Sequence, residues 1–523
     1  MPVKLYDTTL RDGAQGMGIS YSLSDKLQIT QHLAAIGIPY IEGGWPGSNP
    51  KDTSYFQAVK ELEHGTSKIV AFGSTRHPNK RVTKDRQIQA LLEAQTDVVA
   101  IVGKAWDLHV EQVLETDFDT NLTMIWETIV VLKERGKEVI FDAEHFFDGY
   151  RANPGYALHV LETAADAGAD WLVLCDTNGG SMPHQIRSAV RAVTQHLDTP
   201  LGIHTHNDAE LAVANALEAY RSGALMIQGT INGYGERCGN ANLTSLIPTL
   251  QLKLGVNCIP AQALANLTHV SKTVGEIANM KPLPCAPYVG SAAFAHKGGI
   301  HVAAVEKNPA SYEHIAPDQV GNSRQVLVSE LSGRSNLKYL LERSATRHLE
   351  TEVLKRIKEM EAYGYQFEAA DASLELLVQR LQDPSKPPFQ LIQAMVYSDR
   401  RPGSSTAEAM VKIEIDHEVI QTASSGVGPV HALDEAIRKA LCPVFVELES
   451  VRLMDYKVRI LDPDQATKAV TRVLVEAVSE THSWTTVGCG PDIIQASAEA
   501  LEDTYIYCLS KISKGDKHVN AAC

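Results

Sequence analysis

The feature that most constrains this chain is a regular alternation of short β-branched runs with longer amphipathic segments through its first half. The short runs are typical of strands, and segments with an apolar period near 3.6 residues are typical of helices. The eight expected strands are Val3–Thr8, Pro39–Gly43, Lys68–Gly73, Asp97–Val102, Lys137–Glu144, Asp170–Asp176, Pro200–His206 and Leu225–Ile231. Eight strand–helix units within roughly 250 residues predict an α/β fold, a closed parallel (β/α)8 TIM barrel.

An open, doubly wound sheet is the alternative for such an alternation. That fold commonly places a G-x-G-x-x-G phosphate turn after its first strand, and the segment Arg11–Gly16 does not match this motif. The helices expected between strands include Ser24–Ile36, Asp85–Ala94, Ala157–Ala167 and Ala209–Ser222. Ser24 is the expected N-cap of the first helix, and Gly168 and Gly223 lie where helix C-caps belong.

The pattern changes twice beyond the barrel segment. Residues 263–382 are mostly helical in pattern, except for a loop rich in Gly, His and Pro over 282–320, and the proline-rich segment 383–389 is typical of a linker. Two cycles of three strands and one helix follow, with strands at Phe389–Tyr397, Glu408–Ile415, Glu418–Thr422, Val451–Ile460, Ala469–Val478 and Ser483–Val487, and helices at Val430–Leu441 and Asp492–Leu509. We expect a barrel domain over 1–262, helical linker subdomains over 263–387 and an α+β domain with an internal repeat over 388–523.

Composition excludes several classes of function. The chain has 48 Lys and Arg against 63 Asp and Glu, a formal charge of −15, which disfavours partners such as nucleic acid and anionic membranes. No apolar run approaches the length of roughly 18 residues that a spanning helix needs. The eight cysteines are scattered and the first residues enter a strand pattern directly, without a signal peptide. We expect reduced thiols and a cytoplasmic location.

Polar residues cluster where the barrel strands end, which is where barrel enzymes place their chemistry. In His204-Thr-His206 the period of two points both imidazoles to the same side of the strand. Isolated H-x-H pairs are common, but Asp12 follows the first strand, and Asn240 follows the eighth, which neighbours the first when the barrel closes. Such oxygen and nitrogen ligands suit a divalent metal: zinc, manganese or magnesium.

Arg11 has two interpretations. A guanidinium at a barrel mouth suits bidentate capture of a substrate carboxylate, and beside a metal it indicates an α-keto acid. Alternatively, Arg11 pairs with Glu42 or Glu144 and holds the mouth together. The glycine-rich segment Gly233–Gly239 is likewise either a flexible lid or a tight turn.

Four motifs resemble one enzyme family. They are Asp7–Gln15 (DTTLRDGAQ), His204–Asn207 (HTHN), Asn232–Asn240 (NGYGERCGN) and Gly299–His301 (GIH). Their order along the chain resembles the metal-dependent Claisen-condensing barrel enzymes, which include isopropylmalate, homocitrate and citramalate synthases and the hydroxymethylglutaryl-CoA lyases. The resemblance spans nearly the whole chain, including the helical middle and the repeat.

The resemblance implies roles for individual residues. It implies that Asp12, His204 and His206 bind the metal with Asn240 close by, that Arg11 and Thr177 hold the keto acid, and that Glu144, His301 and Tyr312 are catalytic. In relatives the equivalents of the last two come from the partner subunit, so a homodimer is implied. The repeat is similar to the family's allosteric domain, which binds the end-product amino acid.

Within the family, Ile41–Pro50 and Phe141–Gly149 are most similar to the citramalate synthase branch, and Ala14 stands where isopropylmalate synthases usually carry Glu. The branch implies an acyltransferase that condenses acetyl-CoA with pyruvate to (R)-citramalate and CoA, the first step of a threonine-independent isoleucine pathway. The alternatives are an isopropylmalate synthase acting on ketoisovalerate, and an amino-acid sensor whose barrel has lost its chemistry.

Two Gly-x-Gly-Pro turns, at residues 426–429 and 488–491, suggest where regulation acts. Each precedes an expected helix, whose free N–H groups can hold a carboxylate. The candidate allosteric residues are Gly426, Gly428, Gly488 and Gly490. The branch implies isoleucine as the inhibitor, whereas the plain alternative is a duplicated fold without a ligand.

Overall fold

The computed structural model describes residues 3–326, 350–384, 387–401, 404–461, 469–479 and 482–519. They form two compact units, one of residues 1–294 and 313–324 and the other of residues 295–312 and 325–523. The part of the expected helical region over 327–349 lies outside the described residues. Among the described helices, none combines the length and apolarity needed to cross a membrane.

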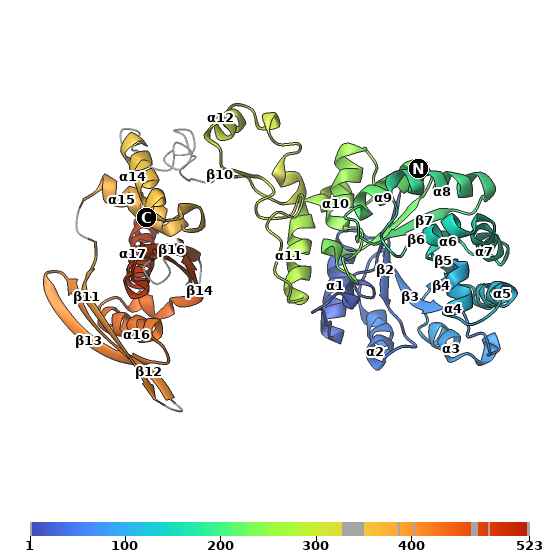
Figure 1. The fold of residues 1–523 in the computed structure, drawn as a ribbon, viewed down its shortest axis with the longest axis horizontal. Helices are drawn as coiled ribbons and strands as arrows, with labels where there is room; N and C mark the ends of the chain where they lie inside the picture. Colours follow the sequence, from blue (N-terminus) through green and yellow to red (C-terminus); the bar gives the residue numbers. More distant parts are fainter. Residues whose placement is uncertain are drawn as a thin grey trace. The chain divides into compact units, whose positions relative to one another are not determined.

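The first unit contains a closed barrel of eight parallel strands, as predicted (Figure 1). The strands are β1 (Lys4–Asp7), β2 (Tyr40–Gly44), β3 (Lys68–Ser74), β4 (Val98–Lys104), β5 (Glu138–Glu144), β6 (Trp171–Asp176), β7 (Leu201–Thr205) and β8 (Met226–Gly229). Closure is direct, because β1 pairs in parallel with β8, with Leu5 opposite Ile227. The open doubly wound sheet is therefore wrong for this chain.

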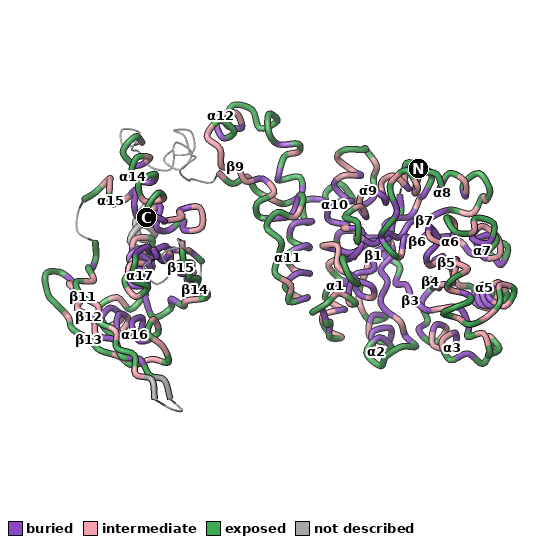
Figure 2. The backbone as a smooth tube through the Cα atoms, viewed as in Figure 1, coloured by how far each residue is buried: buried purple, intermediate pink, exposed green. Residues whose placement is uncertain are grey.

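Helices surround the strands. They are α1 (Leu23–Ala35), α2 (Pro50–Ala58), α3 (Arg86–Glu93), α4 (Asp107–Gln112), α5 (Phe118–Glu134), α6 (Phe146–Ala152), α7 (Pro154–Asp166), α8 (Pro183–His196), α9 (Ala212–Ser222) and α10 (Leu243–Pro248). Strand residues on one side pack against these helices, and those on the other side, such as Val70, Val98 and Ile140, fill the barrel interior. The strands are accordingly buried on both faces (Figure 2).

The helix caps confirm two of the three predicted cap positions and correct the third. The N-cap of α1 is Ser22, not Ser24, because Ser22 and Asp25 form a reciprocal capping box with hydrogen bonds of 2.7 and 3.2 Å. The expected C-terminal glycines are confirmed: Gly168 follows α7 with φ +97°, and Gly223 caps α9 with φ +124°.

The region after the barrel differs from prediction in one respect. The segment 282–320 was expected to be a loop, yet it contains helix α12 (Gly299–Lys307), whose buried Val302 and Val305 anchor it. The two glycines at its start and the prolines on either side of it gave this segment a loop-like composition, although the helix itself contains helix-forming alanines. Other elements here are α11 (Leu267–Ile277), β9 (Ala295–His296), β10 (Gln325–Val326), α14 (Glu350–Tyr363) and α15 (Asp371–Gln382).

The predicted internal repeat is present. Strands β11 (Gln390–Arg401), β12 (Ser404–Ile415) and β13 (Glu418–Gly426) precede α16 (Pro429–Leu441), and strands β14 (Arg452–Ile460), β15 (Thr471–Val478) and β16 (Ser483–Gly490) precede α17 (Ile493–Val519). Each trio forms an antiparallel sheet of its own, and both contribute to one apolar core with the two helices. The repeat is thus structural as well as sequential.

Candidate active site

The candidate metal ligands meet at one end of the barrel. Asp12 Oδ2 lies 3.4 Å from His204 Nε2 and 3.7 Å from His206 Nε2. All three residues are buried, and one ligand atom from each falls within 4.8 Å of the others. Closure of β1 onto β8, next to β7, produces this meeting of residues almost two hundred positions apart.

Unpaired polar atoms show that this set fits a cation. Asp12 Oδ1 and Asn240 Oδ1 are buried and find no hydrogen-bond partner among the described residues. A buried acceptor left unpaired costs about 1–3 kcal/mol, and a cation removes that cost. The Asn240 amide donates to Tyr234 O at 3.1 Å, so its oxygen stays available as a ligand.

The loop that carries Asn240 is a tight turn rather than a lid. The Asn240 amide N donates to Gly233 O at 3.0 Å, and Gly239 has φ +88°. A Cβ on Gly235 would lie 2.1 Å from Asn240 Nδ2, so only glycine lets the loop pass beside that side chain. The glycines therefore place Asn240 beside the metal ligands.

The electrostatics of the three residues also favour metal binding. Burial opposes ionisation of Asp12, but Arg11 and the two histidines outweigh it and lower the pKa of the Asp12 carboxyl. Burial lowers the pKa of His204, with His206 adding to the effect, and burial likewise lowers the pKa of His206. At neutral pH the set is one carboxylate and two neutral imidazoles, the forms that bind metal.

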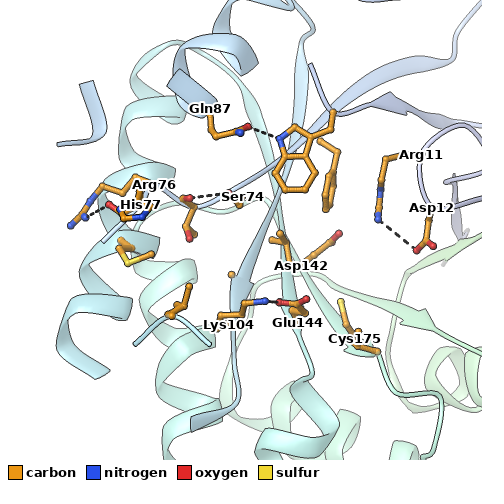
Figure 3. Close-up of a pocket in the computed structure, with 18 of the residues that line it drawn as sticks. Arg11, Asp12, Ser74, Arg76, His77, Gln87, Lys104, Asp142, Glu144 and Cys175 are labelled. Atoms are coloured by element: carbon orange, nitrogen blue, oxygen red, sulfur yellow. Dashed lines mark hydrogen bonds and ion pairs between the residues drawn. The ribbon is translucent and has the colours of Figure 1, made fainter. Parts of the chain in front are cut away.

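Arg11 forms one of the two expected ion pairs and also lines the cavity. Its Nε donates to Glu42 Oε2 at 2.7 Å, so the ion pair is with Glu42 and not with Glu144. Its guanidinium carbon lies 3.8 Å above the ring of Phe72, which Trp45 meets edge-on. Arg11 nevertheless lines the cavity, with Nη1 3.6 Å from Asp12 Oδ2 (Figure 3).

The cavity beside the ligands has a volume of about 570 Å³. Its lining includes Glu144 and Thr177, two further candidates from the sequence. Glu144 forms an ion pair with Lys104 (Figure 3). Thr177 Oγ1 accepts a hydrogen bond from His145 N at 2.9 Å. A cavity of this size accommodates a small keto acid with part of a larger co-substrate.

The remaining candidates belong to the second unit. His301, on α12, and Tyr312 lie together, with ring centroids 4.4 Å apart. Tyr312 is exposed, and so is His301. The structure therefore places these two residues next to each other within the second unit.

Three buried polar residues behind Arg11 and His204 are not among the predicted site residues, although Glu42 is one of the two expected ion-pair partners of Arg11. Glu42 holds Arg11, Gln228 contacts His204, and Asp142 accepts a hydrogen bond from Gln228. Each occupies an inward-facing position of its strand, two residues beyond an apolar interior residue such as Tyr40, Met226 or Ile140. This period of two was available in the sequence and could have found them.

Comparison with known proteins identifies the family. The HMGL-like family model matches residues 2–274, a model described as homocitrate synthase post-HMGL domain-like matches 288–365, and the LeuA allosteric (dimerisation) domain matches 368–509. The first of these covers the whole barrel and more than half of the chain. The chain belongs to the HMGL-like family.

Several relatives of this HMGL-like protein match over nearly its full length. It is 50% identical to the (R)-citramalate synthase of Aquifex aeolicus, over 97% of this chain and 98% of that protein. It is 49% identical to the (R)-citramalate synthase of Synechocystis sp., over 98% of this chain and 97% of the relative. A probable 2-isopropylmalate synthase of Methanopyrus kandleri is 30% identical over 95% and 96% of the two chains.

Proposed function

We propose that this protein is a citramalate synthase, an acyltransferase that condenses acetyl-CoA with pyruvate to give (R)-citramalate and CoA. The observation that carries the proposal is full-length similarity at 50% identity to an enzyme of that name, in a chain whose Asp12, His204 and His206 converge at the barrel mouth. The first step of a threonine-independent isoleucine pathway is the metabolic role that this activity would fill.

Two alternatives have less support. An isopropylmalate synthase would act on ketoisovalerate, but two relatives with such a name are 30% and 29% identical to this chain. A sensor without chemistry would have no need for a buried carboxylate, two neutral imidazoles and an unpaired amide oxygen around one point. Maintaining such unpaired groups is costly unless a ligand uses them.

The mechanism follows from the groups around the cavity. A divalent metal (zinc, manganese or magnesium) held by Asp12, His204 and His206, with Asn240 assisting, would supply Lewis-acid polarisation of the keto group. Arg11, held by Glu42 and stacked on Phe72, orients the pyruvate carboxylate.

Thr177 is the second substrate-binding residue of the proposal, because its hydroxyl lines the same cavity. A base removes a proton from the acetyl-CoA methyl group, and the resulting enolate attacks the keto carbon. Glu144, or His301 with Tyr312, are the candidates for this base. Hydrolysis of the thioester then releases CoA and makes the condensation irreversible.

The proposal includes a homodimer. The match of residues 368–509 to a LeuA allosteric (dimerisation) domain supports association through the C-terminal domain, which the proposal bounds at 388–523. The proposal also keeps a barrel domain over 1–262 and helical linkers over 263–387. His301 and Tyr312 would then complete the site of the partner's barrel. Mixing a Tyr312→Phe chain with a His206→Ala chain should restore part of the activity in heterodimers, and no recovery in verified heterodimers contradicts sharing.

We also propose that isoleucine inhibits the enzyme at the two Gly-x-Gly-Pro turns. A Cβ on Gly426 would lie 2.5 Å from Ala432 N, and one on Gly488 would lie 1.9 Å from Ala496 O, so these two glycines serve strand–helix packing. Gly428 and Gly490 have no such close neighbour. The space beside Gly428 and Gly490 is therefore open to a ligand, and we place isoleucine there.

The experiment that tests the activity is a steady-state assay of CoA release. Purified protein with acetyl-CoA and a divalent metal is supplied with pyruvate or with ketoisovalerate at equal concentrations. A kcat/KM at least tenfold higher for pyruvate is expected. A preference for ketoisovalerate favours the isopropylmalate alternative, and no CoA release with either keto acid favours the sensor.

A further inference from the structure

A buried hydrogen-bond chain runs from the candidate metal site into the barrel. Gln228, on β8, is 1% exposed, and its Oε1 lies 2.9 Å from His204 Nδ1. Its Nε2 donates to Asp142 Oδ1, on β5, at 2.9 Å. Both side chains face the barrel interior, where water does not compete for these contacts.

Asp142 determines which way the Gln228 amide faces. The carboxyl group is 3% exposed, and burial, with Glu42 adding to the effect, raises the pKa of Asp142 to about 8. In the structure Asp142 Oδ1 is the acceptor of the Gln228 Nε2 hydrogen bond, as an ionised carboxylate or a carboxyl protonated on Oδ2 allows. The NH2 group of Gln228 therefore faces Asp142, and its carbonyl oxygen faces His204.

The amide orientation in turn determines the tautomer of His204. A carbonyl oxygen only accepts, so the nitrogen beside it, Nδ1, must carry the hydrogen. The other nitrogen, Nε2, then presents a lone pair, and it is Nε2 that lies 3.4 Å from Asp12 Oδ2. His206 differs, because its Nδ1 has no hydrogen-bond partner within the described residues.

We propose that Gln228 and Asp142 are positioning residues that hold His204 in its Nδ1–H tautomer, so that Nε2 is always free to bind the metal. This inference rests on the metal site of the proposed function. A neutral imidazole in water favours neither tautomer strongly, and partners behind a metal-bound histidine commonly improve metal affinity about 10–100-fold. In this barrel the partner of His204 is the amide of Gln228 instead of the usual carboxylate. The carboxyl group of Asp142 in turn orients that amide.

The test measures the dissociation constant for Zn²⁺, and separately for Mn²⁺, by competition with a chelator. Gln228→Met keeps the side-chain length but removes the acceptor, and should weaken binding about 10–100-fold. The double variant Asp142→Asn with Gln228→Glu reverses the direction of the inner hydrogen bond but restores an acceptor to His204 Nδ1. It should recover affinity to within about threefold of the wild type.

Asn215→Leu is the matched control, because Asn215 is a fully buried amide that donates to Ser181 O at 2.8 Å, away from the metal ligands. It should lower thermal stability without changing metal affinity. If Gln228→Met does not fold, Asp142→Val replaces it. That change leaves Gln228 free to turn over and should weaken metal binding.

The outcomes separate this inference from the proposed function. Wild-type protein that binds neither metal stoichiometrically refutes the metal site itself. Unchanged affinity in Gln228→Met, or equal weakening in Gln228→Met and in the folded double variant, refutes the tautomer role while leaving the metal site intact. Loss in Gln228→Met with recovery in the double variant supports the inference.

Discussion

Replacing Arg11 by lysine keeps the positive charge at the barrel mouth but removes the planar fork of the guanidinium. In the structure that fork has three tasks: Nε donates to Glu42 at 2.7 Å, the plane stacks on Phe72 at 3.8 Å, and Nη1 lies 3.6 Å from Asp12. A lysine ammonium has three donors on one atom, but it lacks the planar fork that holds Glu42 while presenting parallel N–H groups to a carboxylate. The Arg11→Lys variant therefore loses either its anchor on Glu42 or its contact with the substrate.

The expected magnitude follows from the charged hydrogen bond that lysine cannot form while it holds its other partner. A hydrogen bond to a charged group contributes about 1.5–3 kcal/mol, which corresponds to a fall of about 10- to 150-fold in kcat/KM for pyruvate. The Michaelis constant should rise and turnover should fall, because the keto acid is both less tightly held and less well oriented. The pKa of Glu42, already raised by burial, should rise further when its guanidinium partner is removed.

Steady-state CoA release with varied pyruvate measures both constants. Arg187→Lys is the control, because Arg187 also pairs with a carboxylate, Glu218, but lies on the barrel exterior. It should change neither constant by more than about twofold, as expected for a surface ion pair. Arg11→Lys kinetics that match those of Arg187→Lys refute the substrate-binding role and leave Arg11 as a structural residue.

Three further outcomes are expected. His206→Ala should abolish stoichiometric metal binding and turnover while the circular dichroism spectrum stays native. A metal content equal to that of the wild type contradicts the assigned metal site. Burial raises the pKa of Asp142 from 3.8 to about 8, so the stability that its protonated form contributes to the metal-free protein is present below pH 3.8 and lost as the pH rises through 8. In Asp142→Asn the free energy of unfolding in urea should therefore vary less with pH across that window. The same pH dependence as in the wild type contradicts this. Gly490→Val should fold normally yet weaken isoleucine binding at least tenfold by calorimetry, because a Cβ there meets no close neighbour, and unchanged binding places the ligand elsewhere.

Much of the fold could be predicted because its signals are local. Short β-branched runs located all eight barrel strands to within a few residues, and the Gly-x-Gly-Pro repeat located two strand–helix cycles. Where local signals were weak, prediction failed. Helix α12 begins with glycine and lies in a segment of loop-like composition, and its Val302 and Val305 are buried in the folded chain.

The candidate site likewise has one part that local sequence determines and one part that only the tertiary structure determines. The alternation of side chains along a strand is a property of the chain itself, so sequence alone determined that His204 and His206 face one way and that Asp12 follows the first strand. Barrel closure and strand register decided the rest: Arg11 pairs with Glu42, Glu144 pairs with Lys104, and Gln228 joins His204 to Asp142. Such pairings depend on which strands become neighbours and how far each is shifted, and a local pattern along one chain carries no record of either.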